Sequence, residues 1–133
     1  MNILFFLTPK EDVIFVEEED TLRQVIEKID HHRYTAIPML NRQGKYTGTI
    51  SEGDLLRYIK NVYTLNIRDA EYCPIKNVPL RWTYTPVRVN CNMEDLVEVA
   101  MGQNFVPVVD EQNNFIGIIR RQDILKYCYN KSK

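Results

Sequence analysis

The sequence contains little of what several classes of protein depend on. Three cysteines stand among 133 residues, at positions 73, 91 and 128, and they have no C-x-x-C spacing. Scattered cysteines in an odd number argue against a disulfide framework and against a cysteine-based zinc site, and they predict free thiols in a reducing compartment. The net charge is −1, and no stretch has the basic footprint of a nucleic-acid-binding protein.

Long apolar runs are also missing. The N-terminal run, Ile3 to Leu7, is too short for a membrane span or for the core of a signal peptide. We therefore expect a soluble, cytoplasmic protein without a membrane or nucleic-acid partner. Because the run is apolar all round, we expect it to be buried, either under the domain or in the interface of a homodimer.

What the chain does contain is typical of a folded globular protein. It is 44% hydrophobic and 26% charged, and its length suits one compact domain or two small repeats with a common core. Apolar patterning predicts a helix after a capping box at Thr21 and Gln24, and a second helix from Ser51 to about Val62. Strands are expected at 13–16, 35–40 and 46–50.

The second half of the sequence repeats the first. Pro38, Gly48 and Asp54 recur 69 positions later, as a proline, a glycine and an aspartate at 107, 117 and 123. Self-similarity at a fixed offset is the signature of a repeat architecture. The prediction is an α/β fold of two β-α-β-β-α repeats related by a pseudo-two-fold axis. We expect the first repeat at 1–63, a linker at 64–78 and the second repeat at 79–133.

The stretch from Gly48 to Asp54 is the best candidate for a binding site. Ser51 is placed to cap a helix, and Asp54 follows three residues later in its first turn. A hydroxyl, several backbone N–H groups and a carboxylate thus converge on one strand-to-helix turn, which could hold a phosphate and a ribose. The alternative is a capped helix without any ligand.

These motifs resemble a tandem pair of cystathionine-β-synthase (CBS) domains, called a Bateman module. The resemblance rests on the Thr-Ala-Ile-Pro strand, the Gly-Thr-Ile-Ser-Glu-Gly-Asp turn and their second copies. It implies that Ser51 binds a ligand phosphate and Asp54 the ribose, while Val13 and Ile14 lie on a neighbouring strand. The adenine would lie against the strand Thr35, Ala36, Ile37 and Pro38.

The resemblance also implies a function. It predicts a regulatory protein that binds AMP, ADP, ATP or cyclic di-AMP, and small bacterial cyclic-di-AMP-binding CBS proteins are similar. No segment is left over for a catalytic domain, so we expect no enzyme and no required cofactor. Instead, a homodimer would signal its ligand state to an unknown protein target. The alternative is a ligand-free scaffold for protein interactions.

The second copy of the turn departs from the pattern. Arg120 stands at the position of Ser51, and Phe105 stands at the position of the small Ala36. Without a hydroxyl the second helix loses its side-chain cap. The second site is expected to be either vacant or changed, so that Arg120 and Arg121 hold phosphates beside Asp123. We therefore expect the first turn to be the main site.

Two further features have plain structural interpretations. His31 and His32 are adjacent at the end of a predicted helix, where positive charge is favoured, and no third metal ligand has suitable spacing. Trp82 lies in an irregular stretch between two prolines and is expected to pack beneath it rather than to contact a partner.

Overall fold

The structure of the chain is a computed structural model, and it describes residues 2–64 and 66–132. Met1, Leu65 and Lys133, which the expected repeat and linker boundaries include, lie outside the described residues. The helical elements are η1 (Ile3–Phe6), η2 (Lys10–Asp12), α1 (Leu22–His32), α2 (Glu52–Val62), α3 (Ile67–Ala70), η3 (Ile75–Asn77), α4 (Met93–Ala100) and α5 (Arg121–Lys131). The strands are β1 (Thr8–Pro9), β2 (Val16–Glu17), β3 (Ala36–Leu40), β4 (Tyr46–Ser51), β5 (Val87–Arg88), β6 (Phe105–Val109) and β7 (Phe115–Arg120).

The element order confirms the predicted α/β repeats, because β-α-β-β-α occurs as β2-α1-β3-β4-α2 and again as β5-α4-β6-β7-α5. The chain folds as two compact units. The central unit is Ile14–Thr83, and the terminal unit combines the described residues of 1–13 with those of 84–133. This grouping differs from the boundaries expected from the sequence, because Thr8 in β1 pairs antiparallel with Ile118 in β7.

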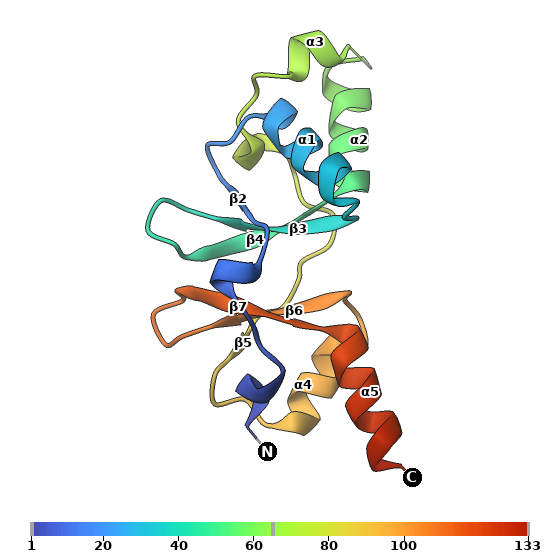
Figure 1. Cartoon of the computed structure of the whole chain (residues 1–133). Coiled ribbons are helices and arrows are strands. Elements are labelled where there is room, and N and C mark those ends of the chain that lie inside the picture. Colours follow the sequence, from blue (N-terminus) through green and yellow to red (C-terminus); the bar gives the residue numbers. More distant parts are fainter. Residues whose placement is uncertain (1, 65, 133) are drawn as a thin grey trace. The chain divides into compact units, whose positions relative to one another are not determined.

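The central unit is a three-stranded sheet in the order β2-β3-β4 with helices on one face. Figure 1 shows α1 and α2 on the same side of β3 and β4. Buried apolar residues of both helices and of the strands form the core: Leu22, Val25, Ile29, Ile37, Ile50, Leu55 and Ile59. Ala70, Ile75 and Val78 complete this core, so part of the expected linker is packed in the central unit.

Helix α1 begins and ends as the sequence predicts. The Thr21 hydroxyl accepts a hydrogen bond from the Gln24 N–H, and the Gln24 side chain accepts one from the Thr21 N–H, which confirms the capping box. His31 and His32 form its last turn, and Arg33 leaves the helix in the left-handed conformation (φ 57°). The two histidines therefore end a helix, as expected.

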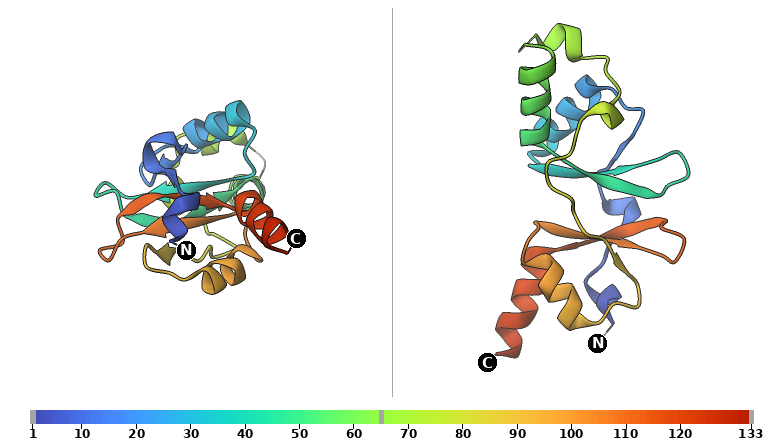
Figure 2. Two further views of the ribbon diagram at one scale, coloured as in Figure 1. Left: turned by 60° about the horizontal axis from the view of Figure 1, so that its bottom comes forward. Right: turned by 180° about the vertical axis from the view of Figure 1, so that it is seen from behind.

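The terminal unit is a four-stranded sheet in the order β1-β7-β6-β5. Figure 2 shows α4 and α5 on one face of this sheet. Its N-terminal segment is buried only in part, because Ile3 is fully buried whereas Phe5 is 78% exposed. Met101, directly after α4, and Leu125, in α5, are also exposed.

Pro38 occupies the middle strand of its sheet, although its missing N–H favours an edge. The pairing explains how the proline fits. On the β4 side Pro38 is opposite Thr49, but β2 pairs only with Met39 and Leu40. Pro107 repeats this arrangement, because β5 pairs only with Val108 and Val109. Each proline therefore lies just outside the stretch that pairs with the parallel neighbouring strand, β2 or β5.

Candidate functional site

The candidate site is built around the junction of β4 and α2. Ser51 has an extended backbone (φ −110°, ψ 162°) and caps α2. Its Oγ accepts a hydrogen bond from the Asp54 N–H at 3.1 Å, and Asp54 Oδ2 accepts one from the Ser51 N–H at 3.0 Å. The predicted cap is thus confirmed as a reciprocal capping box, with Asp54 in the place of the usual glutamate.

Asp54 is one of three buried polar or charged residues in the described part of the chain, and its side chain is 2% exposed. Asp54 Oδ1 accepts a hydrogen bond from Arg57 Nη2 at 2.7 Å and another from the backbone N–H of Arg81 at 3.0 Å. Together with the Ser51 N–H, these donors satisfy the buried carboxylate. The carboxylate is therefore engaged by its own chain.

The strand expected to face adenine lies directly beside this turn. Ala36 pairs with Ser51 across the two strands, and the Thr35 carbonyl accepts a hydrogen bond from the Glu52 N–H at 3.0 Å. Side chains alternate along a strand, so Ala36 and Pro38 share one face, whereas Ile37 points to the other and is fully buried in the core. On that face Ala36 is partly exposed whereas Pro38 is buried, so in this structure a ligand would contact Ala36 but neither the Pro38 nor the Ile37 side chain.

Val13 and Ile14 precede β2 rather than belonging to it. The expected strand 13–16 is present only as Val16–Glu17, and Val13 instead ends the short helix η2. Val13 belongs to the terminal unit, whereas Ile14 belongs to the central unit and packs against its core. β2 pairs with only two residues of β3.

The second turn, between β7 and α5, has a different chemistry. Arg120 caps α5 without a side-chain hydrogen bond, which confirms that the cap is lost with the hydroxyl. The Arg120 guanidinium pairs instead with Asp123, at 3.1 Å between Nε and Oδ2. Asp123 is more accessible than Asp54, because its side chain is 23% exposed.

The two arginines of the second turn have different partners. Arg121 donates a hydrogen bond from Nη2 to the side-chain oxygen of Asn104, whereas Arg120 holds Asp123. In this structure they therefore do not converge on one point. Phe105 is 8% exposed and its ring contacts that of Tyr84, with centroids 5.0 Å apart. A buried aromatic ring thus takes the place that Ala36 has in the first copy.

An open cavity of about 450 Å³ lies at the surface beside the second turn and is lined by residues of the terminal unit. Arg120, Asp123 and Lys126 line it from α5. Phe6 and Tyr127 line it with aromatic rings, and the two rings meet edge to face with centroids 5.4 Å apart. This size is within the usual range for small-molecule sites.

Sequence reasoning missed two residues that contact Asp54. Arg57 had a usable signal, because a basic residue three positions after an acidic one lies on the same face of a helix. Arg81 had none, since it contacts Asp54 through its backbone N–H from 27 residues away. Trp82, the next residue, is 69% exposed, so the expectation that it packs beneath its segment is wrong.

The described residues hold no group of three or more histidine, cysteine, aspartate or glutamate side chains that could bind a metal ion. All three cysteines are free, as the sequence predicts. Among the helices of residues 2–64 and 66–132, none is long and apolar enough to cross a membrane.

Comparison with known proteins identifies the repeats. A family model described as the CBS domain matches residues 6–61 and again residues 75–130. An uncharacterised protein of Methanocaldococcus jannaschii is 24% identical over 129 residues, which cover 96% of this chain and 44% of that protein. The chain thus spans less than half the length of this relative.

Two solved structures have the same fold. CbpB of Listeria monocytogenes, in complex with c-di-AMP, is 23% identical with a TM-score of 0.82, and the match covers 94% of this chain and 92% of that chain. CBSX2 of Arabidopsis thaliana, in complex with AMP, is 20% identical with a TM-score of 0.77 and a coverage of 99% and 98%. At these identities the likeness shows the fold, while the two family matches assign both halves of the sequence. The chain therefore belongs to the CBS domain family and carries two CBS domains in tandem.

Proposed function

We propose that this chain is a regulatory protein that binds an adenine nucleotide at the turn between β4 and α2. The observation that carries the proposal is the reciprocal capping box, which sets a hydroxyl, a helix N-terminus and a carboxylate on one turn. Two structures of the same fold were solved with AMP and with c-di-AMP, and they support an adenine nucleotide as the ligand class.

Each group at the turn has a role that suits its chemistry. Ser51 and the Gly53 N–H in the first turn of α2 bind a phosphate, because the N-terminus of a helix favours an anion. The N–H groups of Glu52 and Asp54 already donate to Thr35 and to Ser51. Asp54 accepts hydrogen bonds from the ribose hydroxyls, since a carboxylate is a pure acceptor. Backbone groups of residues 35–38 and the small Ala36 receive the adenine, with Ile14 contributing apolar contacts.

The second turn is proposed as a subsidiary site. Arg120 and Asp123 line a cavity there, and a guanidinium can bind a phosphate through two parallel hydrogen bonds. Arg121 would have to give up its hydrogen bond to Asn104 in order to bind a phosphate together with Arg120.

The proposed mechanism is regulatory and not catalytic. The ligand shifts the population of two conformations, and an unidentified protein target recognises one of them. We propose that the protein acts as a cytoplasmic homodimer and requires no cofactor.

A ligand-free scaffold is the second candidate, and one observation favours it. The acceptor oxygens of Asp54 are already engaged by Ser51, Arg57 and Arg81, so the carboxylate has a sufficient structural role. In that case the exposed Trp82 and Tyr72 would serve as contacts for a protein partner.

Calorimetric titration with AMP, ATP and cyclic di-AMP separates the two functions. Binding should stabilise the fold by about 2.7 kcal/mol at a hundredfold excess of ligand over the dissociation constant. Asp54→Ala should weaken binding clearly, and Asp123→Ala should weaken it less. Asp54→Asn serves as a check on folding, because it retains the size of the buried side chain. Equal losses at the two aspartates would contradict the assignment of the first turn, and turnover of nucleotide would contradict a purely regulatory role.

A further inference from the structure

Residues 79–83 form a short segment that crosses the central unit next to the candidate site. They have neither helical nor strand conformation and follow the short helix η3. Two anchors hold them. The half-buried Leu80 side chain packs against the core, and the Arg81 N–H donates to Asp54 Oδ1 at 3.0 Å. We call residues 79–83 the strap.

The first anchor lies on the sheet beside the turn. Gly48 is three residues before Ser51 in β4, and a Cβ atom added to it would lie 2.7 Å from Leu80 Cδ1. The strap therefore approaches the strand as closely as it does because position 48 carries no side chain. The Leu80 tip covers β4 directly before the turn.

The second anchor occupies the group that a ribose would need. Three groups donate hydrogen bonds to the Asp54 carboxylate. Oδ1 accepts from Arg57 Nη2 and from the Arg81 N–H, and Oδ2 accepts from the Ser51 N–H. A carboxylate has about four acceptor positions, whereas two vicinal hydroxyls need two of them. At least one donor must therefore leave before a ribose can bind as proposed.

Of the three donors, the Arg81 N–H is held most weakly. The Ser51 N–H belongs to the capping box, and Arg57 is a residue of α2 itself. The strap makes only this one hydrogen bond within the described part of the chain. Segments with few hydrogen bonds and little buried surface open at the lowest cost in free energy.

We propose that the strap is a gate on the Asp54 site. In the closed state Arg81 occupies the carboxylate and Leu80 covers the adjoining strand, and a nucleotide binds only when the strap lifts. This inference rests on the proposed function and adds its regulation. A strap closed in about nine molecules of ten would weaken the apparent affinity about tenfold relative to an open one.

Trp82 provides a direct signal of the gate. It is the only tryptophan of the chain, it is 69% exposed, and the Arg81 guanidinium lies 5.9 Å from the centroid of its ring. When Arg81 leaves Asp54, the surroundings of the indole change. The fluorescence of Trp82 should therefore change on ligand binding.

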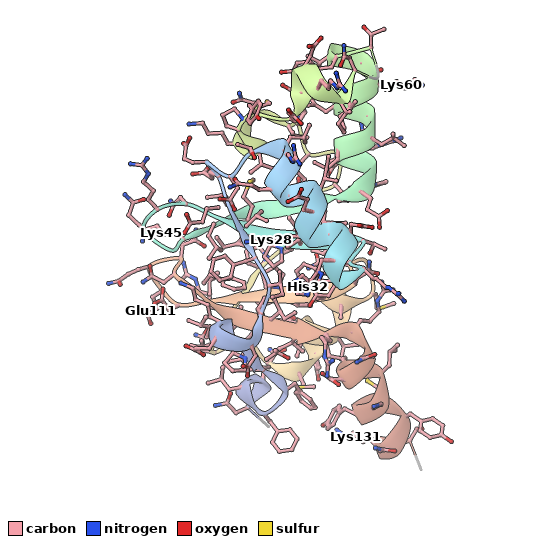
Figure 3. The ribbon with its side chains drawn as sticks, turned by 45° about the horizontal axis from the view of Figure 1, so that its top comes forward. Lys28, His32, Lys45, Lys60, Glu111 and Lys131 are labelled. Carbon is pink, nitrogen blue, oxygen red and sulfur yellow. The ribbon has the colours of Figure 1, made fainter. Side chains whose placement is uncertain are left out.

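The experiment compares two strap variants with a control. Arg81→Pro removes the N–H donor, and Leu80→Ala removes the apolar anchor. Lys60→Ala is the control, because Lys60 is exposed and lies near the end of α2 remote from the sheet (Figure 3). The probes are AMP and cyclic di-AMP, followed by calorimetry and by Trp82 fluorescence in parallel titrations.

We expect both strap variants to bind the probe several-fold more tightly than the wild type, and the control to bind it as the wild type does. The fluorescence of wild-type Trp82 should saturate at the calorimetric dissociation constant. In an Asp54→Ala background, Leu80→Ala should produce no tightening.

Other outcomes separate the two proposals. The gate is overturned if the protein gives saturable heat but both strap variants bind with unchanged or weaker affinity. It is also overturned if the fluorescence of Trp82 does not change on binding. In either case the nucleotide site remains intact. If neither the wild type nor any strap variant binds a probe, the proposed function itself fails. Binding by the variants but not by the wild type supports the gate most strongly.

Discussion

Gly48 and Gly117 occupy the same position in the two repeats, but their neighbours differ in kind. A Cβ at Gly48 would meet the mobile tip of Leu80, whereas a Cβ at Gly117 would meet the carbonyl oxygen of Thr8 in β1. The backbone of a paired strand cannot move aside as a side-chain tip can. The repeat thus predicts both glycines, but only the structure shows why the second is less replaceable.

Gly117→Ala should consequently destabilise the protein more than Gly48→Ala. Both substitutions also strain a positive φ (158° at Gly48 and 156° at Gly117), and overpacking adds about 1–3 kcal/mol, with the smaller addition where a leucine tip can yield. Urea unfolding of the two variants measures the difference. Equal losses would show that β1 is not held as closely against β7 as described.

Tyr58 supplies a prediction that depends on pH. Its hydroxyl lies 3.5 Å from Cys73 Sγ. This hydrogen bond, together with burial, raises the pKa of Tyr58 above its ordinary value of about 10. The folded state then keeps a proton that the unfolded chain loses, so the stabilisation is complete below about pH 10 and declines as the pH rises above it.

Tyr58→Phe should remove that part of the alkaline loss. Thermal unfolding of both proteins between neutral pH and about pH 11 tests the point, because the other tyrosines are common to the two. Parallel curves through the whole range would contradict the assignment to Tyr58.

Among single residues, local chemistry was predictable and distant contacts were not. The bond between Ser51 and Asp54 spans three positions and follows from helix capping. The Arg81 contact with Asp54 depends on where the strap runs, which no local pattern encodes. The exposure of Trp82 was mispredicted for the same reason.

At the scale of elements, α2 and α5 differ in how they begin. Ser51 caps α2 with its hydroxyl, whereas Arg120 offers α5 no side-chain cap. Arg120 does pair with Asp123, but its side chain is 53% exposed, and exposed ion pairs contribute little to stability.

Arg120→Ser should therefore stabilise the protein, by about 1 kcal/mol, because the new hydroxyl can accept a hydrogen bond from the Asp123 N–H. Ser51→Ala should destabilise it by about the same amount. Melting temperatures of the two variants test both signs. A neutral Arg120→Ser beside a destabilising Ser51→Ala would show that α5 does not need a cap.

Most elements could be predicted from capping residues and apolar periodicity, as α1, α2 and the hairpin strands show. The strands β1 and β2 are two residues long, and so short a strand has no periodicity to read. The short helices α3 and η3 were expected to be linker, because the prolines around them are typical of loops. Tertiary packing of Ala70 and Ile75 determines their structure instead.

At the scale of the whole molecule, the offset of 69 residues predicts two repeats but not how the chain divides into compact units. The N-terminal segment joins the second repeat through the pairing of β1 with β7, which lie more than a hundred residues apart. A repeat reveals equivalent positions, whereas the pairing of an N-terminal strand with the second repeat does not change the offset.

The expected homodimer is testable at this scale. Phe5 is 78% exposed beside the buried Ile3, and a second copy would cover it. Light scattering at micromolar concentration should give twice the mass of one chain, and Phe5→Glu should shift the mass towards the monomer. A strictly monomeric wild type would rule the dimer out.

The central claim is that the chain binds an adenine nucleotide, and calorimetric titration of the wild-type protein tests it most directly. We predict saturable heat with AMP, ATP or cyclic di-AMP, accompanied by thermal stabilisation that grows with ligand concentration. The absence of both heat and stabilisation with all three nucleotides at millimolar concentration would contradict the claim and favour the scaffold.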